Sequence, residues 1–262
     1  MKRHILILGG TTEARQLAQL LAPRTGLAVT LSLAGRTVSP LAQPVPVRRG
    51  GFGGTAGLAQ YLRGQGIDAL IDATHPYAAI MSAHAAEAAL QTNTPLIALR
   101  RPAWRAVAGD RWTDVLDTGG AVRALGTASR RVFLALGRQE IAPFARAPQH
   151  HYLIRSVDPV QPPLAVPHAR YIEERGPFGE QQERALLAEH AIEAVVAKNS
   201  GGEATYGKIA AARALGIEVL LIRRPPDLGG RGVTEVSEAI AWLDHVLGTD
   251  AHVPGAELDR GV

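Results

Sequence analysis

The stretch ILILGGTTE, residues 5–13, decides the fold of this protein. Four apolar residues run directly into two glycines, and a segment whose apolar residues have helical spacing follows, up to Leu21. The pattern predicts a buried strand over 5–8, a tight turn and a crossover helix over 12–21, which is how parallel α/β sheets are built. At such a turn the N–H groups and the partial positive charge of the helix N-terminus favour a phosphate group.

The turn departs from the usual G-x-G-x-x-G spacing, so it does not by itself establish a nucleotide site. A tight strand-to-helix turn with a threonine as N-cap explains the same residues without a ligand. Both interpretations stay open at this point. The first predicts that a cofactor is bound by Gly9, Gly10, Thr11, Thr12 and Glu13.

The rest of the chain repeats this alternation of short apolar runs and helical segments. Runs that are apolar along their whole length are buried on both faces, as in a doubly wound sheet. The predicted strands are 5–8, 28–33, 45–47, 69–71, 96–99, 131–136, 152–156, 194–197 and 219–222. The predicted helices are 12–21, 58–63, 77–90, a short one after 120, 178–189, 205–215 and 236–247.

This order predicts an α/β protein of two Rossmann-like doubly wound domains with mainly parallel sheets. Residues 1–127 are expected to form the first domain, and residues 128–248 the second. Residues 249–262 show no periodicity and are expected to form a loose tail.

Composition excludes several classes of function. The chain has 262 residues and no cysteine, which rules out disulfides, thiolate metal sites and cysteine nucleophiles. Its nine histidines show no metal-ligand spacing, so we expect no metal. A net charge of +4 spread along the chain, with only 5% aromatic residues, argues against nucleic acid as a partner. No apolar run is long enough for a membrane span or a signal peptide, so we expect a cytoplasmic protein. Separately, we expect a monomer.

Arg36 follows the second predicted strand, where an NAD-preferring site usually carries an acidic residue that binds the ribose 2′-hydroxyl. A guanidinium cannot accept those hydrogen bonds, but it can bind a 2′-phosphate. Arg36 therefore favours NADPH over NADH as the cofactor. An arginine exposed in a loop is the plain alternative.

Two further loops leave the same edge of the predicted sheet. RGGFGG, residues 49–54, either brings its backbone close to a ligand or is simply flexible. DATHPY, residues 72–77, brings an imidazole and a phenol to this edge, although a histidine in such a loop is more often a capping or packing residue. The candidate cofactor-binding residues in these loops are Gly51, Phe52, Gly53 and Thr74, and the candidate proton donors are His75 and Tyr77.

Together these segments resemble the precorrin-6A reductase family, which includes the cobalt-precorrin-6A reductases. Each segment is a weak signal, but their order along the chain, up to about residue 247, is specific. The matching segments are ILGGTTEA at 7–14, GR at 35–36, GFGG at 51–54, DATHPYA at 72–78, RPxW at 101–104, LGR at 136–138, ERGPF at 174–178, KNSGG at 198–202 with Thr205 and Lys208, and RP at 224–225.

The resemblance implies an enzyme that uses NADPH to reduce one double bond of the precorrin-6A macrocycle, giving precorrin-6B in cobalamin biosynthesis. It also implies two Rossmann-like domains with the ligands in an interdomain cleft: residues 1–127 as the NADPH-binding domain, and residues 128–248 as the second α/β domain that completes the substrate cleft. This tetrapyrrole carries acetate and propionate groups, so a cleft edged by cationic side chains suits it. The residues expected to bind the substrate are Arg101, Arg138, Ser200, Gly201, Gly202 and Lys208.

Lysine is rare in this chain, with Lys2, Lys198 and Lys208 as its three. Two of them in one segment suggest a need for a compact ammonium that can change its protonation state, although two ordinary surface lysines would look the same. Hydride reduction also needs a proton, and the candidate donors are Lys198, Tyr77, His75 or bound water.

Three other functions fit parts of the pattern. A tetrapyrrole-handling lyase or synthase without a nucleotide would not need the glycine turn together with Arg36. A two-lobed small-molecule binding protein would more often carry a secretion signal. A sugar-nucleotide transferase would bind its nucleotide in the second domain.

Overall fold

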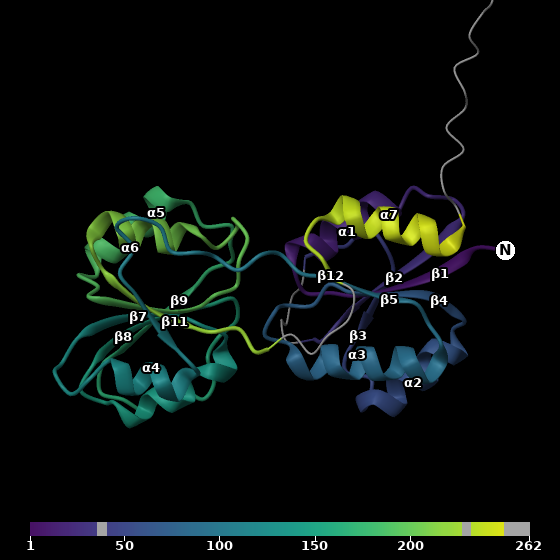
Figure 1. Ribbon diagram of the computed structural model, residues 1–262. Helices are drawn as coiled ribbons and strands as arrows, with labels where there is room; N and C mark the ends of the chain where they lie inside the picture. Colours follow the sequence, from purple (N-terminus) through teal and green to yellow (C-terminus); the bar gives the residue numbers. More distant parts are fainter. Residues whose placement is uncertain (36–40, 227–231, 249–262) are drawn as a thin grey trace, which may run out of the picture. The chain divides into compact units, whose positions relative to one another are not determined.

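The computed structural model describes residues 1–35, 41–226 and 232–248. These residues fall into two compact units, each a layered α/β structure (Figure 1). The first unit comprises residues 1–35, 41–100 and 232–248, and the second comprises residues 101–226. Arg36 and the tail predicted over 249–262 lie outside the described residues.

The first unit is built on a sheet of six parallel strands. These are β1 (Arg3–Leu8), β2 (Leu27–Leu33), β3 (Val47–Arg49), β4 (Ile67–Asp72), β5 (Leu96–Leu99) and β12 (Gly232–Val233). They lie in the order β12-β5-β4-β1-β2-β3, so the chain runs outward from β1 to β3 and then from β4 to the other edge. Dinucleotide-binding sheets share this order, and they bind their ligand at the carboxyl ends of the strands where the order reverses, here between β1 and β4.

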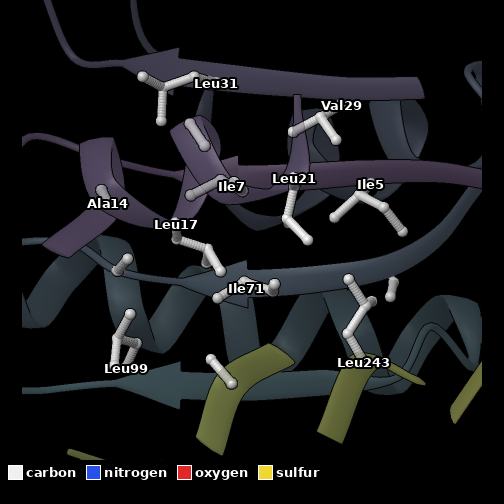
Figure 2. Close-up of a cluster of buried hydrophobic side chains, with 14 of the residues drawn as sticks. Ile5, Ile7, Ala14, Leu17, Leu21, Val29, Leu31, Ile71, Leu99 and Leu243 are labelled. Carbon is white, nitrogen blue, oxygen red and sulfur yellow. The ribbon is translucent and has the colours of Figure 1, made fainter. Parts of the chain in front are cut away.

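Helices cover both faces of this sheet. They are α1 (Thr12–Leu21), α2 (Gly54–Gly64), α3 (Ala79–Thr92) and α7 (Val236–Leu247). Ile5 and Ile7 point to the side of α1 and α7, where Leu17 joins them in a buried cluster (Figure 2). Leu6 and Leu8 point to the side of α2 and α3. Because side chains alternate between the faces of a strand, the all-apolar run in β1 supplies both cores.

The second unit repeats this plan with another sheet of six parallel strands. These are β6 (Trp112–Val115), β7 (Arg131–Ala135), β8 (His151–Ser156), β9 (Ala169–Glu173), β10 (Ala194–Lys198) and β11 (Glu218–Ile222), in the order β6-β11-β10-β7-β8-β9. Its helices are α4 (Thr118–Ala124), α5 (Glu180–Glu189) and α6 (Gly207–Leu215), with short 3-10 segments at Arg138–Glu140 and Ala142–Arg146. α5 and α6 cover one face and α4 the other (Figure 1), and the strand order reverses between β7 and β10.

Two parallel doubly wound sheets confirm the predicted fold class. The predicted division of the chain, 1–127 and 128–248, differs from the structure. β6 follows β5 along the chain but pairs with β11 in the second sheet, whereas β12 follows the whole second unit and pairs with β5 in the first. A pattern of strands and helices predicts that an element forms, but pairing between distant residues decides which sheet it completes.

The sequence pattern does not predict β6, β9 or β12, all of which are edge strands. Edge strands are short and partly solvated, so they lack the continuous apolar run that marks a central strand. α6 also begins at Gly207 rather than Thr205. The carbonyl of Phe178 packs so close to Gly207 that a Cβ there would lie 2.4 Å from it.

Across residues 1–35, 41–226 and 232–248, no helix combines the length and apolar character that crossing a bilayer requires. The same part of the chain holds no group of three or more His, Asp or Glu side chains suited to a metal ion.

Candidate functional site

The glycine turn after β1 lies at the point where the strand order of the first sheet reverses. Gly10 has φ +124°, a backbone conformation that residues with a Cβ rarely adopt. A Cβ on Gly9 would lie 2.6 Å from the Leu31 side chain. The path of the chain from strand to helix therefore requires glycine at position 10, and a side chain at position 9 would displace the tip of Leu31.

Thr11 connects the start of α1 to the end of β4. Its hydroxyl accepts a hydrogen bond from the N–H of Ala14 at 3.1 Å, as an N-cap, and donates one to the carbonyl of Ala73 at 2.9 Å. The predicted capping role of a threonine here is confirmed. Thr12 beside it is exposed and Glu13 is half-buried, both in the first turn of α1.

The end of β2 lies beside the glycine-rich loop that follows β3. The N–H of Gly50 donates to the carbonyl of Leu33 at 2.9 Å, and a Cβ on Gly35 would lie 3.8 Å from the same Gly50 nitrogen. Gly35 and Gly50 both have positive φ, +74° and +98°. The described chain thus reaches this edge of the sheet immediately before Arg36.

Arg48 holds the glycine-rich loop in place. Its guanidinium donates to the carbonyls of Gly50 at 2.6 Å and Gly51 at 2.8 Å, and it stacks on the Phe52 ring at 3.7 Å. Phe52 also meets the Tyr61 ring edge-on. Sequence reasoning missed Arg48, although an arginine two residues before a run of glycines was a signal for such a clamp.

Thr74 is buried, and its hydroxyl donates to Asp72 at 2.6 Å. The buried carboxylate of Asp72 also accepts from the Thr74 N–H and from Arg100, at 2.9 Å. The loop after β4 is therefore tied to the end of its strand. The hydroxyl of Thr74, a residue predicted to bind the cofactor, is thus engaged in the hydrogen bond to Asp72.

His75 and Tyr77 follow in the same loop, and both are half-buried. Their ring centroids lie 5.6 Å apart. Two of the three side chains predicted as proton donors thus come together at the edge of the first sheet that carries the glycine turn. The third, Lys198, belongs to the second unit.

A pocket of about 270 Å³ opens within the second unit. It is formed by the carboxyl ends of β7 and β8, the loops that follow β7, β8 and β9, and the start of α6. The charged residues that line it are Arg138, Glu140, Arg155, Asp158, Glu174 and Lys208. Two predicted substrate residues, Arg138 and Lys208, are therefore brought together here.

Lys208 is a buried cation at this pocket, 6% exposed. Its ammonium donates to the carbonyl of Thr205 at 2.5 Å and lies 5.0 Å from the centroid of the Trp104 ring. Burial lowers the pKa of Lys208 to about 7. Glu183 opposes this effect, whereas the positive charges of Arg155 and Arg101 add to it.

Arg155, which lines the pocket, forms a buried ion pair with Glu183. The Arg155 guanidinium donates to both carboxylate oxygens of Glu183 and stacks on the Phe178 ring at 3.6 Å. A second carboxylate, that of Glu174, lies 3.7 Å from the same guanidinium. Neither Arg155 nor Glu183 was among the predicted site residues, because no local pattern pairs a strand residue with a helix residue 28 positions away.

The ammonium of Lys198, at the end of β10, forms an ion pair with Glu140. Glu140 in turn accepts from the Gly137 N–H at 3.2 Å and lines the pocket. The predicted proton donor Lys198 therefore borders the pocket through its carboxylate partner.

The remaining predicted substrate residues form a different cluster in the second unit. Arg101 donates to the carbonyl of Ser200 at 2.7 Å, and Arg224 donates to that carbonyl at 2.9 Å and to the carbonyl of Pro102 at 3.1 Å. A Cβ on Gly201, where φ is +68°, would lie 2.0 Å from the Pro102 carbonyl oxygen. This segment is a tightly bonded clasp, and its residues do not line the 270 Å³ pocket.

Gly202 and Asn199 complete this clasp. Trp104 donates through its indole to the carbonyl of Gly202 at 2.9 Å, and its N–H donates to the Asn199 side chain at 2.8 Å. The Asn199 amide returns a hydrogen bond to the Trp104 carbonyl at 3.0 Å. The segment therefore holds Trp104, whose ring faces the Lys208 ammonium, in a fixed position.

Comparison with known proteins gives concordant matches over nearly the whole chain. Residues 4–244 match the family described as precorrin-6x reductase CbiJ/CobK. A precorrin-6A reductase of Sinorhizobium sp is 54% identical, covering 94% of each chain, and that of Rhodobacter capsulatus is 51% identical, covering 92% of this chain and 96% of the relative. A solved structure of CobK precorrin-6A reductase is 49% identical with a TM-score of 0.89, over 93% of this chain and 97% of the other.

Proposed function

The chain belongs to the precorrin-6x reductase family, and we propose that it uses NADPH to reduce one double bond of the precorrin-6A macrocycle, giving precorrin-6B in cobalamin biosynthesis. The observation that carries the cofactor part of this proposal is the turn of Gly9 and Gly10 at the point of reversal in a sheet of the dinucleotide-binding order. Family membership supports the substrate part.

The first unit is the proposed binding site of the nucleotide. The N-terminus of α1 offers N–H groups and a partial positive charge to the pyrophosphate, and the two glycines leave room for its close approach. Thr11 and Thr74 support this edge through their bonds to Ala73 and Asp72. The residues proposed to contact the cofactor are Gly9, Gly10, Thr12, Glu13, Gly51, Phe52 and Gly53.

Arg36 is the proposed determinant of NADPH over NADH. It directly follows Gly35, which lies next to Gly50 at the carboxyl end of β2. In dinucleotide-binding sheets this end of the second strand meets the ribose 2′ position of the adenosine. A guanidinium there binds a 2′-phosphate through charge-assisted hydrogen bonds, which NADH does not offer.

NADPH supplies a hydride when it is bound, and the residues of this chain orient the reactants and hold the proton that completes the reduction. His75 and Tyr77 carry such protons at the edge of the first sheet where the glycine turn lies. Lys198 carries one in the second unit, where its ammonium forms an ion pair with Glu140. These three side chains remain the proposed proton donors.

The second unit is proposed to recognise the tetrapyrrole. Its pocket carries Arg138, Arg155 and Lys208, cationic side chains of the kind that bind the acetate and propionate groups of the macrocycle. The clasp around Ser200 and Gly201 holds its own carbonyls in internal hydrogen bonds. Its contribution to binding is proposed to be the positioning of the segment between β10 and α6.

The test is a titration of the purified protein with NADPH and with NADH, followed by nicotinamide fluorescence. We expect tight binding of NADPH and weaker binding of NADH. Arg36→Ala is expected to weaken NADPH binding by about tenfold or more, because a charge-assisted hydrogen bond contributes roughly 1.5–3 kcal/mol. The affinity for NADH should change little.

Arg63→Ala is the matched control, because Arg63 is an exposed arginine of the same unit that bonds only the Gln91 carbonyl among the described residues. It should leave both affinities unchanged. If neither nucleotide binds the wild-type protein, the result contradicts the reductase proposal and favours a tetrapyrrole-handling function without redox chemistry.

A further inference from the structure

Lys208 lies at the pocket of the second unit with hydrogen-bonding capacity that its protein contacts do not use. An ammonium has three N–H donors. One of them reaches the Thr205 carbonyl, and the Trp104 ring lies 5.0 Å away. Within the described part of the chain Lys208 forms no ion pair, although its side chain is buried and lines the pocket. A buried charge without a counter-ion is costly, so this arrangement favours an anion at the pocket.

The charged groups around Lys208 come from every element packed against it. Glu183 of α5 holds Arg155 of β8, so each compensates the other. Glu174, after β9, lies 3.7 Å from that guanidinium, and Glu140 is paired with Lys198.

Arg138 and Asp158 complete the charged lining, from the loops after β7 and β8, and Arg101 acts on Lys208 from the clasp. When Lys208 is protonated, the cations in and around the pocket (Arg101, Arg138, Arg155, Lys198, Lys208) outnumber the acids (Glu140, Asp158, Glu174, Glu183) by one. The loss of its proton removes this excess of one positive charge. A carboxylate that enters the pocket is therefore bound better when Lys208 carries its proton.

The volume of the pocket limits what it can hold. Sites that enclose a whole drug-sized ligand measure about 300–1,000 Å³. At about 270 Å³ this pocket is below that range, and a tetrapyrrole is larger than such ligands. The pocket has room for one side arm of a larger molecule, with the carboxylate of that arm beside Lys208.

We propose that this pocket binds one acetate or propionate arm of the tetrapyrrole and that Lys208 forms the ion pair with its carboxylate, taking up a proton as the arm enters. The inference rests on the proposed function for the identity of the molecule that carries the arm. It assigns Lys208 to substrate recognition, separate from the proton donors at the reacting bond.

The pKa of Lys208 supports this coupling. Burial lowers it to about 7, so near neutral pH the protein alone holds Lys208 partly as the neutral amine. An opposite charge within about 4–6 Å raises the pKa of a base by roughly 1–3 units. Arrival of a carboxylate thus converts Lys208 to its ammonium form and makes binding weaker as the pH rises above neutral.

The experiment uses the rarity of lysine in this chain. When lysine is labelled with ¹³C at Cε, the NMR spectrum contains signals from Lys2, Lys198 and Lys208 alone, because the chain has three lysines. Lys208→Met and Lys198→Met assign the three signals. The pH titration of each signal is then recorded for the wild-type protein alone, with sodium propionate, with propionamide as the uncharged matched probe, and with uroporphyrin, a stable tetrapyrrole with acetate and propionate arms.

We expect Lys208 to titrate near pH 7 in the protein alone and about 1 unit or more higher with propionate or uroporphyrin, while propionamide leaves it unchanged. Sodium chloride at equal ionic strength controls for screening, and Lys2 is the internal reference. A Lys208 that titrates like Lys2, or that responds to neither carboxylate probe, overturns the proposal.

A further titration tests whether the anion bound by Lys208 belongs to the tetrapyrrole or to the cofactor. NADP⁺ and inorganic phosphate are added in place of the carboxylates. A Lys208 signal that responds to these and not to uroporphyrin would assign the pocket to the cofactor and overturn the substrate-arm inference. None of these readings depends on turnover, so failure of the reductase proposal, seen as absent NADPH binding, is distinguishable from failure of this one.

Discussion

Arg155 and Glu183 form a bidentate ion pair in the interior of the second unit, where their side chains are 6% and 1% exposed. The pair joins β8 to α5 and places a carboxylate near the Lys208 ammonium. Each charge is tolerable in the interior because the other satisfies it. This relationship links the stability of the unit to the properties of its pocket.

Glu183→Gln is expected to destabilise the protein by about 3–5 kcal/mol, because it leaves the Arg155 guanidinium buried with a neutral partner. Urea unfolding followed by circular dichroism measures this change. The double variant Arg155→Met/Glu183→Leu removes both charges and is expected to recover most of the lost stability. A Glu183→Gln protein as stable as wild type would show that the pair contributes nothing.

Lys208→Met is expected to raise the free energy of unfolding at pH 7, on the order of 1–4 kcal/mol, because an apolar side chain replaces a buried cation. The folded-state pKa of Lys208, about 7, is below its usual value of 10.5, so between these values the unfolded chain binds more protons than the folded one. The destabilisation caused by burying Lys208 is therefore greatest below pH 7 and disappears above pH 10.5. Unfolding at pH 7 and pH 10 should show the advantage of Lys208→Met shrinking, and a constant difference would refute this account.

Thr11→Val is expected to destabilise the protein by about 1–2 kcal/mol, because it removes the N-cap bond from Ala14 and leaves the Ala73 carbonyl without its donor. We also expect weaker NADPH binding, since the start of α1 loses its attachment to β4. Thr11→Ser keeps the hydroxyl and should restore both properties. Thr12→Val changes the exposed neighbour and should leave the melting temperature within a degree or two of wild type.

Gly201→Ala is expected to destabilise the second unit by more than about 2 kcal/mol. The new Cβ would lie 2.0 Å from the Pro102 carbonyl oxygen, at a φ of +68° that alanine rarely adopts. Gly179→Ala is the control in the same unit, because Gly179 has φ −76° and a Cβ added there would meet nothing within 4 Å. It should change the stability by no more than about 0.5 kcal/mol, and equal effects of the two variants would contradict the clasp.

His150 is fully buried, and burial lowers the pKa of its imidazole below the ordinary 6.5. The N–H of Arg130 donates to its Nδ1 at 3.2 Å, which requires the unprotonated nitrogen. Below pH 6.5 the unfolded chain therefore binds a proton that the folded protein resists, and stability falls until the folded-state pKa is passed. Unfolding between pH 8 and pH 5 should show this loss.

His150→Gln should flatten that pH dependence, because no imidazole remains to titrate at this buried position. His151→Gln, which changes the exposed neighbour, should retain it. An unchanged slope in His150→Gln would locate the acid sensitivity elsewhere.

Much of the fold can be predicted from single stretches of sequence. The run from Ile5 to Leu8, the two glycines and the capping Thr11 act on neighbours within a few residues, so strand, turn and helix follow from local physics. The same holds for α7, found over Val236–Leu247 as its periodicity predicts. The order of these elements also determined the parallel doubly wound class and the edge of the sheet that carries the glycine turn.

The tertiary structure alone decided which strand completes which sheet and what surrounds the cations of the second unit. β6 and β12 are short edge strands whose partners lie far away in the chain, so their own residues do not reveal that β6 joins the second sheet and β12 the first. Lys208 carries no sign in the sequence that it is buried, nor Arg155 that it meets Glu183. Burial and ion pairing are sums over contacts from several elements, and only the folded chain brings those contacts together.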